Sequence, residues 1–165
     1  MSHQIDFIST VGRQAVFEGL APNRYRYRLI IPWGDPCNRC MFVMLNPSTA
    51  DATHDDATIR RCRSFAEAMG HEAIDVVNLF GLCSTDPREL KRALAEGRDP
   101  IGPKNDGHIV EAMATARTIV CAWGTHGGLL GRDRQVRALL ETGQRFAKAP
   151  PIVRLPKALT PVPWI

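Results

Sequence analysis

MFVMLNPSTADATHDDATIRRC, from Met41 to Cys62, is the stretch of sequence that decides the fold. Its apolar run, Met41 to Leu45, is typical of a buried strand. Asp55 or Asp56 then suits the N-cap of a helix whose apolar residues recur at helical spacing as far as Met69. A strand that leads through a short polar loop into a helix indicates an α/β fold. In such folds ligands bind where strands end and helices begin.

Strand and helix patterns alternate along the rest of the chain. Further strands are expected over 25–31, 73–80, 118–123 and 152–155, and further helices over 86–96, 105–116 and about 136–143. The strand 25–31 is expected near a sheet edge with its arginines facing solvent, and 41–45 is its candidate hairpin partner. Because helices separate most successive strands, we predict a three-layer αβα fold with a mostly parallel central sheet.

Length and composition predict a single domain over residues 1–165. The chain has 165 residues, of which 44% are hydrophobic, enough for a sizeable core. Residues 1–20 carry no clear pattern and are expected to form either an extra helix or a loosely attached arm. The net charge of +4 permits a phosphate-bearing partner without requiring one.

The cysteines and the absence of long apolar runs predict a cytoplasmic protein that does not enter a membrane. The first residues show no signal-peptide pattern, so the five cysteines are expected to be reduced thiols. No apolar run approaches the roughly 18 residues that span a bilayer. Cys37-x-x-Cys40 supplies only half of a zinc knuckle, and the other cysteines are scattered. We therefore predict no metal and no cofactor, while the oligomeric state is left open.

Polar residues gather at the predicted strand ends. Asn78 lies in an apolar strand, where an amide is either satisfied by backbone or kept for a ligand, and an amide suits recognition of a nucleobase edge. The loop that begins at Asn46 either binds an anion through its peptide N–H groups or is a capped turn. Other candidate ligand-binding residues are Pro47, Ser48, Phe80, Asn105, Trp123 and Gly124.

Three carboxylates follow the loop and are candidate catalytic residues with Asn46. Asp51, Asp55 and Asp56 have the chemistry to bind a metal, to act as a base or to cap the helix. Their spacing is no specific metal signature, so a cap with ion pairs to Arg60 or Arg61 is the favoured alternative. These two arginines, together with Arg63, are candidates for a cationic surface that contacts a nucleic-acid backbone.

Five motifs, in order, resemble the signature of a bacterial and phage family known as domain of unknown function 1643. They are LNPSTAD (Leu45 to Asp51), DDATIRRC (Asp55 to Cys62), VVNLF (Val76 to Phe80), IGPKND (Ile101 to Asp106) and AWG (Ala122 to Gly124). The resemblance covers roughly Tyr25 to Trp164. It implies a single-domain protein and carries no established activity.

A more distant resemblance is to the uracil-DNA glycosylase-like superfamily. Asn46-Pro47 resembles the loop in which that superfamily positions the attacking water, and Asn78 resembles the asparagine delivered to the pyrimidine edge. Because bases commonly stack on aromatic rings, Phe80 or Trp123 is the candidate to stack on a bound base. The usual His-Pro-Ser loop is replaced by Leu159 to Ile165, which contains no histidine.

These observations predict a pocket for a nucleobase or nucleotide at the strand ends. The favoured function is a nucleotide-binding or nucleic-acid-binding module, because the histidine that stabilises a departing base is missing. One alternative is an N-glycosidic hydrolase of the uracil-DNA glycosylase type that uses Asn46. The other is a metal-dependent hydrolase that uses Asp55 and Asp56.

Overall fold

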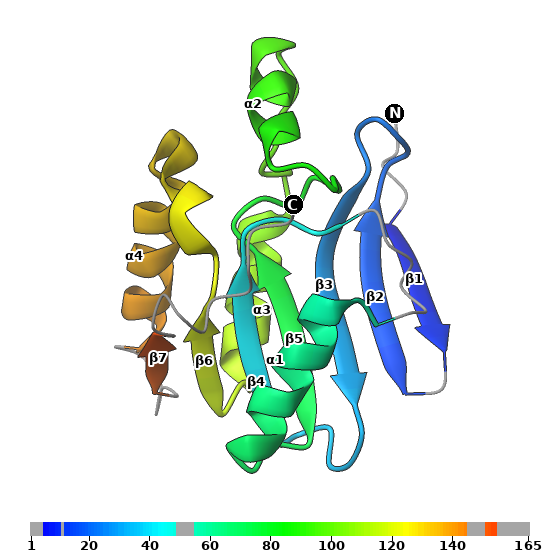
Figure 1. Ribbon diagram of the computed structural model, residues 1–165, viewed down its shortest axis with the longest axis vertical. Helices are drawn as coiled ribbons and strands as arrows, with labels where there is room; N and C mark the ends of the chain where they lie inside the picture. The colour runs from blue at the N-terminus through cyan, green and yellow to red at the C-terminus, as the bar shows by residue number, and fades with distance from the viewer. Residues whose placement is uncertain (1–4, 11, 49–54, 145–150, 155–165) are drawn as a thin grey trace.

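A seven-stranded sheet forms the centre of the protein in this computed structural model, which describes residues 5–10, 12–48, 55–144 and 151–154 (Figure 1). The strands are β1 (Ile5–Thr10), β2 (Arg13–Glu18), β3 (Tyr25–Pro32), β4 (Arg39–Met44), β5 (Ala73–Asn78), β6 (Thr118–Cys121) and β7 (Ile152–Arg154). The helices are α1 (Ala57–Ala68), α2 (Arg88–Ala95), α3 (Asn105–Thr115), the 3-10 segment η1 (Gly124–Gly131) and α4 (Arg132–Gln144). Within the described residues, no helix has the length and apolar character of a membrane span.

The sheet is mixed rather than mostly parallel, which corrects one prediction. Its order is β1-β2-β3-β5-β4-β6-β7. Among the described strands, three neighbouring pairs are antiparallel and three are parallel. The antiparallel half arises because residues 5–10 and 13–18 pair with each other and then with β3. The prediction of an extra helix or a loose arm over residues 1–20 is therefore wrong for these two segments.

The predicted hairpin between 25–31 and 41–45 is also wrong. β3 pairs with β5, and β4 lies one place further on, parallel to both β5 and β6. Cys40, Met41, Phe42 and Val43 are completely buried, so β4 needs cover on both faces. Helices cover both faces of β4, as is usual for a parallel interior strand reached through helical crossovers.

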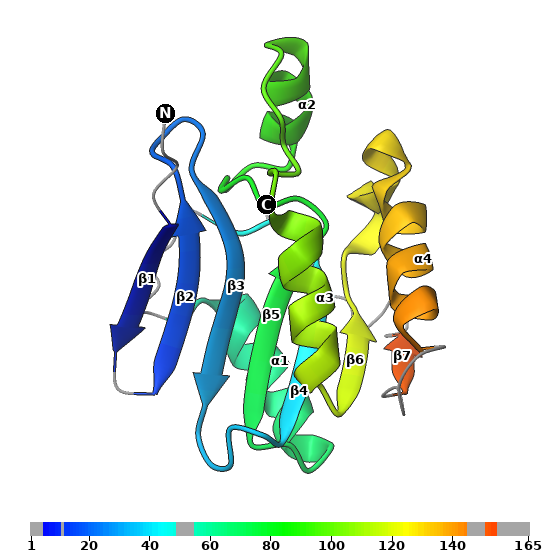
Figure 2. The ribbon, with the colours of Figure 1, turned by 180° about the vertical axis from the view of Figure 1, so that it is seen from behind.

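Two hydrophobic cores separate the sheet from its helices. Met41 and Val43 point into a core closed by α3 and α4, and Cys40 and Phe42 point into a core closed by α1, as the alternation of a strand requires. Figure 1 shows α1 in front of the sheet, and Figure 2, from behind, shows α3 and α4 on the other side. The predicted αβα layering is confirmed, and the two sides are called the α1 face and the α3 face below.

The parallel strands place a topological switch point at the end of β4. The chain leaves β4 through α1 to reach β5 on one side, and it then returns through α2 and α3 to β6 on the other side. Ligands in wound sheets bind outside the carboxyl ends of strands at such a point. The carboxyl edge of β4, β5 and β6 is therefore where a site is expected.

Candidate functional site

The loop after β4 is fastened to the loop after β5. The Asn46 side chain donates through Nδ2 to the carbonyl oxygen of Ser84 at 2.9 Å and to that of Pro47 at 3.2 Å. The Ser84 N–H in turn donates to the Pro47 carbonyl at 2.9 Å. These bonds hold the Asn46 amide in one orientation. They also bring two segments, nearly forty residues apart in sequence, to one place at the carboxyl edge.

The same loop meets the first turn of α1. Asp56 caps this helix, since its Oδ1 accepts from the Ile59 N–H at 2.8 Å, and its Oδ2 lies 3.5 Å from the Ser48 hydroxyl. Asp55 forms an ion pair of 2.6 Å with Nη2 of Arg13. The predicted helix cap is thus confirmed at Asp56. Arg60 donates to the Asp55 carbonyl oxygen at 2.7 Å, a backbone contact rather than the ion pair expected for it.

A metal centre finds no support in the described part of the chain. No group of three or more His, Cys, Asp or Glu side chains there is arranged to hold an ion. Cys40 is buried in β4, which raises the pKa of its thiol to about 12. Cys37 lies exposed in the turn before that strand. Asp51 lies outside the described residues.

Asn78 ends β5 with a buried amide that has an unused donor. The residue is 2% exposed, and its Nδ2 has no hydrogen-bond partner among the described residues. Asn78 is opposite Met44 of β4, and it shares the α1 face with Ile74 and Val76 by strand alternation. A buried N–H without a partner costs about 1–3 kcal/mol. Such groups are rare in native proteins and call for an explanation such as a ligand.

Arg26 adds a buried cation that the sequence pattern did not indicate. It is 6% exposed, and within the described part of the chain its Nε has no hydrogen-bond partner. Burial lowers its pKa, while the charges of Cys83 and Asp56 act in the opposite direction. Because the Arg26 N–H donates to the Gly81 carbonyl at 2.9 Å, Arg26 lies beside the carboxyl end of β5. The prediction of a solvent-facing arginine is wrong here.

A β-bulge sends Arg26 to the α1 face. Val16 is opposite Arg28, and the next residue, Phe17, is opposite Arg26, so Tyr27 is the extra residue on β3. Consecutive residues of β2 point to opposite faces of the sheet, and each residue of β3 points to the same face as the β2 residue opposite it. Phe17 belongs to the core on the α1 face, which places Arg26 on the side of Asn78. No periodicity in YRYRLII reveals this bulge.

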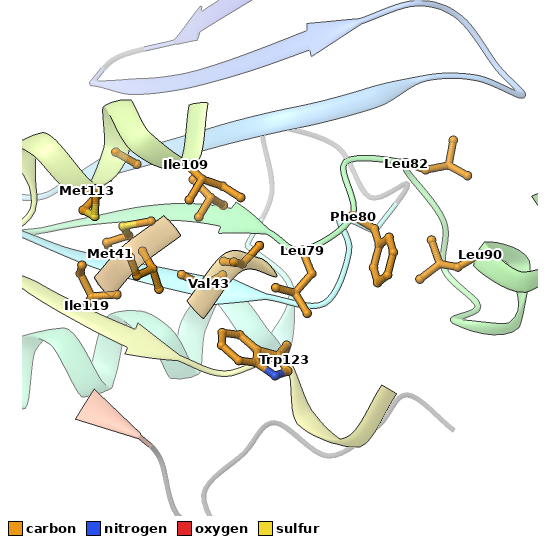
Figure 3. Close-up of a cluster of buried hydrophobic side chains, with 14 of the residues drawn as sticks. Met41, Val43, Leu79, Phe80, Leu82, Leu90, Ile109, Met113, Ile119 and Trp123 are labelled. Carbon is orange, nitrogen blue, oxygen red and sulfur yellow. The ribbon is translucent and has the colours of Figure 1, made fainter. Parts of the chain in front are cut away.

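Three other predicted ligand residues, Phe80, Asn105 and Trp123, lie on the α3 face or in its core. Trp123 packs in that core beside Leu79, and Phe80 is fully buried near Leu90 (Figure 3). Asn105 is fully buried and donates from Nδ2 to the backbone oxygens of Asn78 at 2.9 Å and Leu79 at 3.1 Å. Neither aromatic ring is therefore free to stack on a base held at the α1 face.

Gly124 and Arg61 also take no part in the cluster on the α1 face. Gly124 is an exposed residue with a φ of +68°, at the start of η1. Arg61 is exposed on α1. The structure therefore collects Asn46, Ser48, Asp56, Asn78 and Arg26, with Cys83, at the carboxyl edge of the α1 face; these six residues are called the strand-end cluster.

Comparison with known proteins gives one match. Residues 26–161 match a family described as a protein of unknown function, DUF1643. Neither curated proteins nor solved structures gave a match. The matched residues include the whole strand-end cluster, the strands β4 to β7 and all of β3 except Tyr25. Residues 1–25 lie outside the match, although β1 and β2 complete the sheet.

Proposed function

We propose that this chain, which belongs to the DUF1643 family of proteins of unknown function, binds a nucleotide at the strand-end cluster. The observation that carries the proposal is the buried Asn78 amide, whose Nδ2 has no partner. Retaining that donor costs stability, and a nucleobase carbonyl or ring nitrogen removes the cost on binding. The bound base would take the α1 face of β4 and β5 as its platform.

The topology supports this location. β4 and β5 are parallel neighbours, so the loop that begins at Asn46 and the end of β5 at Asn78 meet at one edge. This juxtaposition fits the uracil-DNA glycosylase-like arrangement, in which one strand delivers an Asn-Pro loop and another delivers an asparagine to the base. We include that fold relationship in the proposal. Both elements also adjoin the switch point, where wound sheets bind ligands.

Hydrolysis of an N-glycosidic bond is the second candidate, because two hydrogen bonds hold the Asn46 amide in one orientation. A water-positioning residue requires such restraint. Binding without hydrolysis is favoured because both candidate catalytic carboxylates in the described part of the chain already have partners. Asp55 pairs with Arg13, and Asp56 accepts from Ile59. The same engagements argue against the metal-dependent hydrolase.

A ligand screen tests the proposal. Nucleosides, nucleoside monophosphates and divalent cations are added separately, and the melting temperature is measured for wild type and for Asn78→Ala. A nucleotide at a hundred times its Kd stabilises the wild type by about 2.7 kcal/mol. For a domain of this size that is a rise of about 5–10 °C. Asn78→Ala is expected to lose the rise while it keeps a cooperative transition.

The outcomes separate the candidates. A rise that survives in Asn78→Ala, or a rise with divalent cations alone, contradicts the proposal. Stabilising nucleotides are then incubated with the protein and analysed by chromatography. Release of free base would replace the binding function by hydrolysis, whereas intact nucleotide after many hours supports binding alone.

A further inference from the structure

We infer that Arg26 is the anion-binding residue of this site and that the ligand is a free nucleotide with a terminal phosphate. The inference rests on the proposed function and names its ligand class. It comes from a second observation, which is independent of Asn78. Arg26 is a buried guanidinium with an unpartnered Nε at the same edge and on the same face of the sheet.

The environment of Arg26 differs from that of an arginine kept for stability. A guanidinium stays charged in a protein, so its burial requires a compensating anion or hydrogen-bond acceptors. Among the described residues, Arg26 forms no ion pair. Asp56 is near enough to act on its charge, but Asp56 already caps α1. The guanidinium therefore lacks a close counter-ion that an incoming anion would supply.

Arg28, two residues further along β3, shows what a satisfied arginine looks like in this protein. Its Nε and Nη2 hold both oxygens of the buried Asp75 at 2.5 to 3.0 Å. Both arginines are on the same strand and both are largely buried. The contrast shows that β3 has a carboxylate partner on the α3 face, whereas no described carboxylate lies at ion-pair distance from Arg26 on the α1 face.

The chemistry of the ligand follows from the shape and burial of Arg26. A guanidinium binds phosphate oxygens through two parallel N–H donors, a geometry that lysine lacks. A phosphodiester inside a polymer carries a nucleoside on each side and does not reach a side chain that is 6% exposed. A terminal phosphate has three free oxygens on one side. We therefore assign Arg26 to the phosphate of a mononucleotide, with Asn78 at the base.

The experiment compares affinities by calorimetry in a phosphate-free buffer. The four ribonucleosides, their 5′-monophosphates and dinucleotides with one internal phosphate are titrated into wild type, Arg26→Met and Arg26→Lys. Wild type is expected to bind one 5′-monophosphate at least thirtyfold tighter than its nucleoside, as for a buried charge pair. Arg26→Met is expected to remove that preference and to bind nucleoside and monophosphate alike.

Arg88→Met is the matched control, since it removes the same charge from an exposed position on α2. It is expected to keep the preference for the monophosphate. Thermal unfolding supplies a second readout. Replacing an unpaired buried charge by an apolar side chain of similar length is neutral or stabilising, so Arg26→Met is expected to melt at or above the wild-type temperature.

Each outcome decides one claim. Equal affinity of wild type for nucleoside and monophosphate overturns the inference and leaves the proposed function standing. No binding of either ligand defeats the proposed function itself. A dinucleotide that binds as tightly as the monophosphate overturns the claim that the ligand carries a terminal phosphate. If Arg26→Met does not fold, Arg26→Lys decides, and an unchanged preference in that variant contradicts the role of the guanidinium fork.

Discussion

The two faces of the sheet treat buried polar groups differently. On the α3 face, Glu18 accepts from the Tyr27 hydroxyl at 2.5 Å and from Nζ of Lys104 at 2.7 Å. Arg132 donates to the Leu79 carbonyl at 2.8 Å and forms an ion pair with Asp106. On the α1 face, the donors of Arg26 and Asn78 described above are without partners.

The two faces differ in which kind of buried polar group lacks a partner. The α3 face has its own exceptions, since Oδ1 of Asn105 and Nδ1 of His108 form no hydrogen bond. The Asn105 oxygen is an acceptor, and Nδ1 of His108 lies 3.3 Å from the Glu111 carboxylate. Unpaired acceptors are less unusual in native proteins than unpaired N–H groups. A protein retains an unpaired buried N–H donor where a ligand supplies the missing acceptor. We therefore expect the buried polar groups of the α3 face to stabilise the fold, and we search for function on the α1 face.

The largest expected effect that tests this contrast comes from Arg28→Met. Among the described residues, the change leaves the fully buried Asp75 with Arg39, at 3.6 Å, as its remaining counter-ion. We expect the free energy of unfolding in urea to fall by about 3 kcal/mol, as for other broken buried ion pairs. The double variant with Asp75→Leu is expected to recover most of the loss. A similar loss in Arg26→Met would break the contrast between the faces.

A second, smaller effect separates the two asparagines. Asn105→Ala removes a donor from two backbone oxygens at the end of β5 and is expected to cost about 2 kcal/mol in the same urea experiment. Asn78→Ala removes a donor that has no partner, so the expected cost is no more than about 1 kcal/mol. Equal costs for the two variants would mean that Asn78 serves the fold as Asn105 does.

The smallest effect extends the contrast to the opposite edge of the sheet, where His71 has partners on both ring nitrogens. Asn38 donates its Nδ2 to the Gly70 carbonyl at 2.9 Å, so its Oδ1, 3.1 Å from Nδ1 of His71, faces a ring N–H. Nε2 then accepts from the Thr118 hydroxyl at 2.9 Å, which is the pattern of a neutral imidazole. Burial accordingly lowers the pKa of His71.

The sign of the pH effect follows from that lowered pKa. As the pH falls below about 6.5, the unfolded chain binds a proton at this histidine before the folded protein does, so stability is lost toward acid. We expect the free energy of unfolding to be lower at pH 5.5 than at pH 7.5, by no more than about 1 kcal/mol from His71. His71→Gln should flatten this dependence. A steeper fall in His71→Gln would contradict the assignment.

The sequence predicted the parts of the fold that depend on local pattern. The apolar run at 41–45 lies in a buried strand, Asp56 caps the helix that follows it, and Asn78 lies near the end of a buried strand, as expected. The positions of Phe80 and Trp123 were harder to predict. β5 ends at Asn78 and β6 at Cys121, and strand alternation does not apply beyond those residues.

Arg26 was missed for a different reason. Its burial depends on β2, which comes from a segment without a clear pattern, and on a bulge that exists only when β2 and β3 are paired. Both are long-range properties of the assembled sheet. Composition and periodicity describe neighbours in sequence, and they carry no information about which strand pairs with which.

The bulge in β3 acts as a phase shift in the strand. Without it, Arg26 and Arg28 would emerge on one side and share the environment of Asp75. With the bulge, a single added residue places Arg26 and Arg28 on opposite faces of the sheet. Arg28 then pairs with a buried carboxylate, and Arg26 remains available for a ligand. The length of this strand, counted residue by residue, is therefore as much a determinant of the site as the identity of any side chain in it.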